Sequence, residues 1–338
     1  MNLDYAHAIE YLPPTVQQAL QSASVFYSRN YERYLTRKHK LPIYIYSDDY
    51  CALFVKSRIY VFRYVDLPVE YLALTHTPTT TPQAFLDACL VVINQQFHVH
   101  WTNPPSSAAV FAAYPSRGMR IPFGSHIIDL TASEDTLWVN VHSKHRNAIR
   151  RAEKGGVVIK AGGMELLHDY LLLDQETWER SGRESRGKPF FADLLDAMGD
   201  ACIVFVAYKD AVPQGGALFL YSPAMCYYMF GASADQPKPG AMNLLHWYAM
   251  LNMRNRSVKR YSFVGCRINE DEESKYHNLQ RFKSRFSGEL VQGYMFKVVL
   301  NRSMYGLFRL LLRIRKGNHP WTCEGIDQEL HQWPELNR

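Results

Sequence analysis

The 338-residue chain is long enough for two domains, and its 47% hydrophobic and 21% charged content is typical of a globular protein rather than a disordered or fibrous one. A net charge of +6 suits a phosphate-bearing partner but does not require one. The six cysteines are dispersed and lack metal-ligand spacing, which argues against a zinc site. The sequence shows no basic segment followed by an apolar one at its start, and no apolar run of roughly 20 residues, so we expect neither a signal peptide nor a membrane span. We therefore expect a cytoplasmic protein with reduced thiols.

The first third of the chain is expected to form an α/β unit. Pro13 and Pro14 precede a helical run that Thr15 can cap, and Asp48-Asp49 and Ser57 mark turns between strands. The expected elements are a helix, three strands, a second helix and a fourth strand, at residues 15–38, 42–46, 51–56, 58–63, 82–96 and 97–101.

Two histidines, His98 and His100, would lie on one face of the last of these strands, because side chains two residues apart point the same way. A pair of histidines could begin a metal site, yet the neighbouring sequence offers no third ligand. We therefore expect a structural role for them and no bound metal.

A basic helix is predicted after two short strands at 118–123 and 125–130. Ser133 is its expected cap, and Gly155-Gly156 ends it. Its apolar side would pack inward, while its other side carries Arg146, Arg150 and Arg151. Such a helix can follow a chain of phosphates or present a solvated basic face, and the sequence leaves both open.

Residues 259–290 contain the most informative pattern. A short buried strand, Tyr261 to Val264, is followed by an acidic loop and a helix. The apolar face of that helix is formed by Leu279, Phe282 and Phe286. Lys283 lies between the two phenylalanines, and Gly288 is the expected C-terminal cap. A lysine in this setting suits an anionic ligand or a developing negative charge; the alternative is a lysine that faces water.

From Val157 onward the expected order of elements is β-α-α-β-β-β-α-β-α-β. This order resembles the GNAT acyltransferase fold, whose mixed sheet opens between its fourth and fifth strands to hold an acyl donor. The resemblance implies that the helix after the fourth strand directs its N-terminus at the donor's phosphates. The matching segment, GASADQPKPGAMNLLHWYAM, offers Lys238 and Gly240 but not the complete glycine-rich loop of a coenzyme A site.

Three short motifs narrow the resemblance. IRRAEKGGV, YYMFGAS and RFKSRFSG, in this order, resemble the FemAB family of peptidoglycan interpeptide-bridge aminoacyltransferases. Members have two GNAT-like domains in tandem and transfer an aminoacyl group from aminoacyl-tRNA to an amine on a cell-wall precursor. The resemblance, strongest over residues 127–296, implies an N-terminal domain at 1–138 joined by the tail 305–338, and a catalytic domain at 139–304 whose sheet starts near Val157.

The resemblance also assigns roles by position. Phe282 and Lys283 match a Phe-Lys pair beside the donor's aminoacyl end, where the lysine would stabilise negative charge on the attacked ester. Arg180 matches an arginine that contacts the acceptor's phosphates, and Arg183 and Arg186 are its alternatives.

The chain departs from the family pattern at two positions. Ser287 replaces the first glycine of the family's Phe-Gly-Gly, and Tyr34 stands where relatives place a lysine against a UDP-sugar diphosphate. A UDP-linked acceptor is therefore less expected. The general base is left open among residues near the strand end: Asp271, Glu272, Glu273 and Tyr261.

The last helical segment, residues 302–316, interleaves leucines with arginines. It could pack on the first domain, as the family's tail does. It could instead act as a basic amphipathic helix that makes peripheral contact with a membrane carrying a lipid-linked substrate.

Together with the resemblance, these features predict an enzyme. The first hypothesis is an acyltransferase, cytoplasmic or at the inner face of the membrane, that forms an amide on a cell-envelope precursor. Its donor would be aminoacyl-tRNA or acyl-CoA, with no tightly bound cofactor. One alternative is an acyl-CoA-dependent N-acyltransferase, such as an N-acetyltransferase, acting on an amino sugar in polysaccharide biosynthesis. Another is a module that binds a polyanion or lipid without catalysis.

Overall fold

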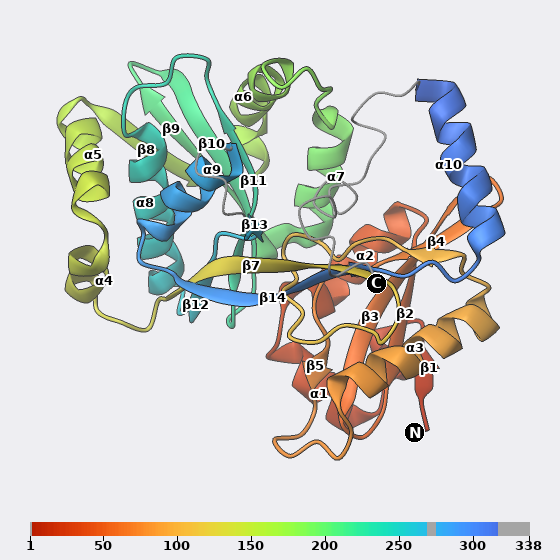
Figure 1. Ribbon diagram of the computed structural model, residues 1–338. Helices are drawn as coiled ribbons and strands as arrows, with labels where there is room; N and C mark the ends of the chain where they lie inside the picture. The colour runs from red at the N-terminus through yellow and green to blue at the C-terminus, as the bar shows by residue number, and fades with distance from the viewer. Residues whose placement is uncertain (1, 269–274, 317–338) are drawn as a thin grey trace.

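The computed structural model describes residues 2–268 and 275–316. Within them the chain forms two mixed β-sheets flanked by helices (Figure 1), as the predicted α/β class requires. The first sheet has the order β1-β2-β3-β4-β6, with β5 paired to β3. Its strands are β1 Asp4–Ala6, β2 Leu41–Tyr46, β3 Tyr50–Ile59, β4 Phe62–Asp66, β5 Leu72–Ala73 and β6 Trp101–Thr102.

Helices cover both faces of the first sheet. On one face, α3 (Pro82–Phe97) buries Phe85 and Ile93 in a cluster with Phe54 of β3. On the other face, α1 (Pro14–Gln21) and α2 (Arg29–Arg37) share a cluster with residues from the second half of the chain. The burial of this second face therefore requires both halves.

Two boundaries between N-terminal elements differ from the predicted ones. The helix expected at 15–38 is two helices, because the hydroxyl of Ser28 accepts a hydrogen bond from the backbone N–H of Tyr31 (3.2 Å) and caps a new helix. The turn expected at Ser57 lies instead at Tyr60, whose backbone adopts a left-handed φ of +53°.

The two histidines do not share a strand face, contrary to the prediction. Helix α3 continues to Phe97, and His98 ends it with a left-handed φ of +48°. His100 has a backbone role, since its Nδ1 accepts from the N–H of Arg63 at 3.2 Å. Over residues 2–268 and 275–316, no group of His, Cys, Asp and Glu side chains could hold a metal ion.

The second sheet has the order β13-β7-β12-β11-β10-β9-β8, with β14 also paired to β7. Its strands are β7 Met119–Asp129, β8 Val157–Gly162, β9 Cys202–Lys209, β10 Val212–Tyr221, β11 Cys226–Ser233, β12 Arg260–Ser262, β13 Cys266–Arg267 and β14 Glu289–Lys297. β11 and β12 are parallel neighbours, whereas the other pairings in this sheet are antiparallel.

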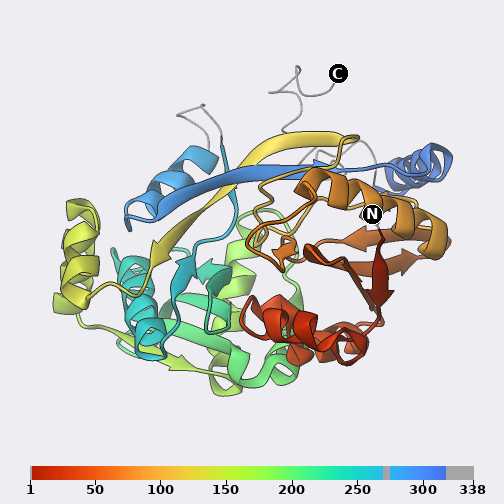
Figure 2. The ribbon, with the colours of Figure 1, turned by 90° about the horizontal axis from the view of Figure 1, so that it is seen from below.

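This sheet starts earlier than the expected Val157. The two strands predicted at 118–123 and 125–130 form the single strand β7, which pairs with β14 along its length and with β12. Figure 2 shows β7 and β14 side by side, extending from the second half toward the first. We still propose a division near residue 138, with β7 of the N-terminal part contributed to the second sheet.

Helices also flank the second sheet. They are α4 Glu134–Asn140, α5 Ser143–Lys154, α6 Leu167–Glu179, α7 Gly187–Met198, α8 Ala241–Asn255 and α9 Lys275–Ser284. The single basic helix expected after Ser133 is split into α4 and α5, because Val141 takes an extended ψ of 131° and His142 caps α5. Ser133 caps α4 as predicted, accepting from the N–H of Thr136 at 3.1 Å.

The two halves meet through a shared core. In it, Ser24 and Tyr227 hydrogen-bond through their hydroxyls (2.9 Å), and Tyr227 lies edge-on to Phe26. Between α2 and α7, Arg37 pairs with Asp196. The final helix α10 (Arg302–Lys316) returns to the first sheet, and none of the helices over the described ranges is long and apolar enough to cross a membrane.

Candidate functional site

The parallel strands β11 and β12 separate soon after they meet. They pair only at Cys226 with Tyr261 and at Tyr227 with Ser262. β11 then continues to Ser233, while β12 ends at Ser262. The backbone beyond this point has no ladder between the two strands, which is the arrangement expected for a donor site in this sheet.

Lys283 belongs to α9, and its side chain reaches the backbone just after the end of β12. Its Nζ donates to the backbone carbonyls of Val264 (2.5 Å) and Gly265 (2.6 Å). These two residues have left-handed φ values of +41° and +37°, which is unusual for the β-branched Val264. An ammonium group has three donors, so these bonds leave one N–H for a ligand.

The surroundings of Lys283 alter its proton affinity. Burial lowers the pKa of Lys283 to about 8, and the neighbouring Cys266 opposes this only in part. The side chain is therefore mostly protonated at pH 7 but loses its charge far more readily than an exposed lysine. The side chain is half-buried and its ammonium is bonded to two backbone carbonyls, whereas the alternative prediction had it facing water.

Aromatic rings surround the helix that carries Lys283. Phe286 is fully buried, and Phe282 lies against it with ring centroids 5.4 Å apart. The carbonyl of Phe282 is 3.0 Å from His145 Nε2 of α5. The strand-end lysine is thus held by helix packing on one side and by backbone carbonyls on the other.

His246 of α8 lies inside this aromatic cluster, and its role was not anticipated. Its Nδ1 is 2.7 Å from the hydroxyl of Tyr261, and within the described ranges its Nε2 has no partner. Burial, with smaller contributions from the Lys283 and His145 charges, lowers the pKa of His246 to about 3. A histidine within the apolar run LLHWYAM was the available sequence signal.

Tyr261, one of the four base candidates, is fully buried. Burial raises the pKa of Tyr261 well above its ordinary value, so it keeps its proton at neutral pH and cannot act there as a base. The other three candidates, Asp271, Glu272 and Glu273, lie outside the described residues.

The segment before α8 combines glycine and lysine as predicted, but Gly240 has a packing role. A Cβ on Gly240 would come within 2.2 Å of the carbonyl oxygen of Ala148 in α5, and its φ is +89°. Glycine is therefore needed for the close approach of the two helices. Lys238 is exposed, and its Cε lies near Gly155, just after the basic end of α5.

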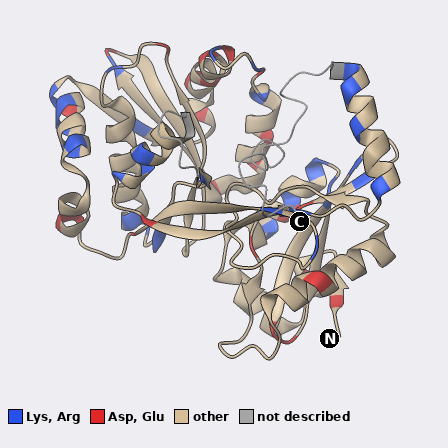
Figure 3. Cartoon of the chain, in the orientation of Figure 1, with Lys and Arg blue, Asp and Glu red and all other residues tan. Residues whose placement is uncertain are grey.

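The three arginines expected on one basic surface separate into two groups. Arg146 donates to the carbonyls of Val139 (2.7 Å) and Val141, so it caps the C-terminus of α4. Arg150 lies over the ring of Trp138 at 5.3 Å, and Arg151 is exposed. Figure 3 shows the basic residues of α5 along one side of the molecule.

The arginines between α6 and α7 also differ in placement. Arg180 donates to Asp235 Oδ1 (2.5 Å) and to the carbonyl of Ser233 (2.8 Å), so its guanidinium is engaged at the end of β11. Arg183 lies over the ring of Trp178 at 6.0 Å. The two halves of the molecule enclose a cavity, and neither Arg180 nor Arg183 lines it.

Arg186 does line that cavity, which has a volume of about 410 Å³ and is called here the Tyr34–Arg186 pocket. Its guanidinium lies 4.9 Å and 5.1 Å from the ring centroids of Phe190 and Phe230. Lys40 and Asp66, also in the lining, form an ion pair at 3.0 Å. Tyr34 and Arg186, far apart in sequence, are thus brought to one pocket.

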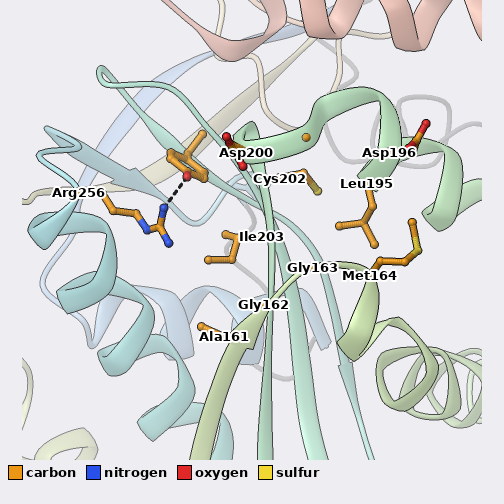
Figure 4. A pocket seen from close by; sticks show the side chains of 12 residues that line it. Ala161, Gly162, Gly163, Met164, Leu195, Asp196, Asp200, Cys202, Ile203 and Arg256 are labelled. Atoms are coloured by element: carbon orange, nitrogen blue, oxygen red, sulfur yellow. Dashed lines mark hydrogen bonds between the residues drawn. The ribbon is translucent and has the colours of Figure 1, made fainter.

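A different cavity of about 420 Å³ lies elsewhere in the second sheet (Figure 4). Its lining includes Asp200, Tyr221 and Arg256, and Arg256 donates to the Tyr221 hydroxyl at 2.9 Å. Tyr221 ends β10, next to the start of β11, so this cavity is at the sheet end opposite Val264. None of the predicted site residues lines it.

A smaller cavity, of about 250 Å³, lies beside the strand-end lysine. Gly265 and Cys266 line it together with Leu279 and Gln280 of α9. Lys283 itself does not line this cavity. The cavity borders Gly265, whose carbonyl accepts a hydrogen bond from the Lys283 ammonium.

A curated relative matches part of the chain in sequence. The lipid II:glycine glycyltransferase of Staphylococcus haemolyticus (strain JCSC1435) is 26% identical over 115 residues, a match that covers 33% of this chain and 27% of that relative. The chain thus matches only about a quarter of the relative's length.

Solved structures with low sequence identity share the fold. A crystal structure of FemX matches with a TM-score of 0.66 at 14% identity, covering 91% of this chain and 99% of that chain. The C-terminal domain of a putative lysylphosphatidylglycerol synthetase from Agrobacterium fabrum matches with 0.57 at 11% identity, covering 91% and 97%. A tandem GNAT protein from the clavulanic acid biosynthesis pathway matches with 0.50 at 11% identity, covering 88% and 98%. The chain therefore has the predicted fold of two GNAT-like units in tandem.

The family assignment rests on a longer match. The model of the FemAB family matches residues 121–212 and 207–313, which together make up more than half of the chain. These ranges include β11, β12 and the helix that carries Lys283. The chain belongs to the FemAB family.

Proposed function

We propose that this chain is an acyltransferase that moves an aminoacyl group from aminoacyl-tRNA to an amine on a cell-wall precursor. The observation that carries the proposal is the Lys283 ammonium at the end of β12, which keeps one N–H for a ligand. The name of the relative from Staphylococcus haemolyticus, a glycyltransferase acting on lipid II, supports this choice of reaction.

The reaction joins an amine to an ester. The acceptor nitrogen attacks the aminoacyl carbonyl, a C–N bond forms, and the C–O bond to the tRNA ribose breaks. Negative charge develops on the carbonyl oxygen in the tetrahedral intermediate, and the fixed Lys283 cation would stabilise it. The nitrogen loses a proton to a base, while the departing ribose oxygen gains one. Phe282 would position Lys283 through the aromatic cluster.

The donor is inferred from the region before α8. Coenzyme A would need free backbone N–H groups in a glycine-rich loop, yet Gly240 is packed against Ala148. Arg150, Arg151 and Lys238 provide positive charge near this helix start, as a polynucleotide donor requires. Because aminoacyl-tRNA is a cytoplasmic molecule, we infer that the reaction takes place in the cytoplasm, without a tightly bound cofactor.

We infer that the Tyr34–Arg186 pocket receives the phosphates of the acceptor. Arg186 forms no ion pair with any residue in 2–268 or 275–316 and is the cation best placed for this role. Arg180 is engaged with Ser233 and Asp235, so it would act by holding the end of β11.

Donor dependence tests the proposal. The purified chain is incubated with a lipid-linked or UDP-linked cell-wall precursor and either charged tRNA or acyl-CoA, and the product is identified by mass spectrometry. We expect an added aminoacyl group with charged tRNA only. Transfer from acyl-CoA alone, in particular to an amino sugar, would establish the N-acyltransferase alternative. Tight binding of RNA or lipid without transfer from any donor would establish the non-catalytic one.

A further inference from the structure

We propose that α10 and the β3–β4 turn together form a docking surface for an anionic lipid bilayer. The surface, called here the α10 surface, consists of six exposed apolar side chains: Tyr60, Val61, Leu307, Leu310, Leu311 and Ile314. It lies on the first half of the molecule, away from the second sheet (Figure 1).

The inner side of α10 is fully used for packing. Phe308 stacks on Trp101 with ring centroids 4.7 Å apart and contacts Phe62 at 5.2 Å. Tyr305, one turn earlier, contacts the same Trp101 at 5.3 Å. These contacts determine which side of α10 faces outward. The exposure of the other side is therefore not a result of loose packing.

The outer side of α10 is apolar, although it faces solvent. Leu307, Leu310, Leu311 and Ile314 have the spacing of one helical stripe, and Ile314 is 73% exposed. A contiguous apolar stripe on a surface marks an interaction site. Within the described residues nothing covers it.

The β3–β4 turn, next to α10, exposes further apolar side chains. Tyr60 is 78% exposed and Val61 follows it, while the next residue, Phe62, is buried against Phe308 of α10. The turn and the helix are therefore neighbours. Tyr60 holds a left-handed φ of +53°, an unfavourable conformation for an aromatic residue that nevertheless presents its ring to solvent.

The charge around these apolar side chains has one sign. α10 reads RSMYGLFRLLLRIRK and the turn reads KSRIYVFR, and neither contains an aspartate or glutamate. Arg313 and Arg315 are exposed beside Ile314. Figure 3 shows only basic charge along α10. An apolar stripe with a basic border is typical of helices that lie in the interface of anionic membranes. A second copy of this chain would bring like charges together, so the lipid surface is favoured.

The α10 surface is close to the Tyr34–Arg186 pocket. β4 begins at Phe62, against α10, and ends at Asp66, in the pocket lining. Four residue steps in a strand span about 13 Å. If the acceptor is lipid-linked, which rests on the proposed function, its head group would reach the pocket while the chain is docked. The docking itself does not depend on that reaction.

Vesicle co-sedimentation tests the docking without donor or acceptor. The full chain is mixed with vesicles of phosphatidylcholine alone or with added phosphatidylglycerol. We expect binding to the anionic vesicles only, weakened by salt. Failure here would overturn the docking and leave the proposed transfer reaction intact, because that reaction is measured separately with its own substrates.

Two pairs of variants separate the contributions. Arg313→Gln with Arg315→Gln should weaken binding to anionic vesicles about 30-fold, from two lost surface charges. Leu310→Gln with Ile314→Gln should also weaken it while leaving the thermal midpoint unchanged, since both side chains are exposed.

Matched controls lie on the other side of the molecule. Lys144→Gln with Lys154→Gln makes the same charge change on α5, and Val139→Gln with Val158→Gln removes comparably exposed apolar side chains. Both control proteins should bind like the unmodified chain; equal losses in them would overturn the proposal. A lower thermal midpoint for the α10 apolar variant would mean that the chain covers its own stripe. A change from dimer to monomer in that variant would mean that a second copy does. Either outcome overturns lipid docking.

Discussion

Lys283 holds its ammonium group against the carbonyls of Val264 and Gly265, and this contact sets both its position and its charge. A cation fixed before the reaction stabilises an oxyanion without reorganisation, and loss of one such group typically costs about 2.7–4 kcal/mol. We therefore predict that Lys283→Met lowers kcat at least about 100-fold and changes donor affinity far less. Steady-state kinetics with charged tRNA measure both quantities.

Arg281→Met is the matched control for this variant. Arg281 is an exposed cation on the same helix, and it donates to Asn278 within that helix. It should keep the rate of the unmodified enzyme. A Lys283→Met protein with the unmodified rate but a lowered thermal midpoint would show that the lysine only supports the strand end.

The pKa of about 8 at Lys283 also predicts a pH dependence. As pH rises through 8 the ammonium loses its proton and its charge, so kcat should fall on the alkaline side with an apparent pKa near 8. An ordinary lysine would keep its charge to about pH 10. Arginine stays protonated throughout this range, so in Lys283→Arg the alkaline fall should move upward or vanish. An unmoved alkaline limb in that variant would assign the titration to another group.

His246 and Tyr261 form a buried pair whose worth can be measured. Removing the imidazole in His246→Phe leaves the Tyr261 hydroxyl without its 2.7 Å partner, which should cost about 1–3 kcal/mol of unfolding free energy. Adding Tyr261→Phe removes the orphaned hydroxyl and should restore most of that loss. Chemical denaturation of both single variants and the double variant measures the coupling.

The same double variant distinguishes a structural from a catalytic role. A stable double variant with a normal rate would make the pair a packing element. A stable one with a reduced rate would mean that the buried pair supports the transfer reaction as well as the fold. Additive stability losses in the two single variants would contradict the pairing itself.

At the scale of elements, α5 combines a structural arginine with two surface ones. Arg150 and Arg151 are exposed, whereas Arg146 caps α4. Arg150→Glu with Arg151→Glu should weaken tRNA binding and flatten its salt dependence, because each lost phosphate contact lowers the logarithmic slope by about 0.7–0.9. Filter binding across a salt titration measures the slope. An unchanged slope would show that Arg150 and Arg151 form only a solvated face of α5. Because Arg146 caps α4, Arg146→Glu should instead lower the thermal midpoint of the protein.

The sequence predicted elements well where one pattern governs them. α8 and β9 to β11 are rich in apolar residues, and they stand in the predicted order along the chain. The breaks before α2 and α5 depend on single caps, Ser28 and His142, inside otherwise helical runs. The expected cap Gly288 also was not the one used: α9 ends at Ser284, and Ser287 takes the left-handed φ of +63°. Local hydrogen bonds decide such ends, and periodicity does not register them.

At the scale of the whole molecule, the candidate site depends on pairings that the sequence could not reveal. The Phe282-Lys283 pair was predicted from a motif. The hydrogen bonds from the Lys283 side chain to the backbone carbonyls of Val264 and Gly265 are seen only in the folded structure. Tyr34 and Arg186 meet only because the two halves pack together. Likewise β7 joins the second sheet by pairing with β14, far along the chain. Tertiary packing rather than local pattern determines each of these.

The shared core further implies that the two halves unfold together. Tyr227, on β11 of the second half, is buried against Phe26 and hydrogen-bonds Ser24 of the first half. Replacing a buried aromatic residue by alanine typically costs about 3–5 kcal/mol. We predict that Tyr227→Ala lowers protection from hydrogen exchange by the same free energy in β2 and β3 as in β9 and β10. Val139→Ala, an exposed change on α4, should alter neither set. If only the strands of the second half lost protection, each GNAT-like unit would be stable alone, and the Tyr34–Arg186 pocket between them would open without unfolding either one.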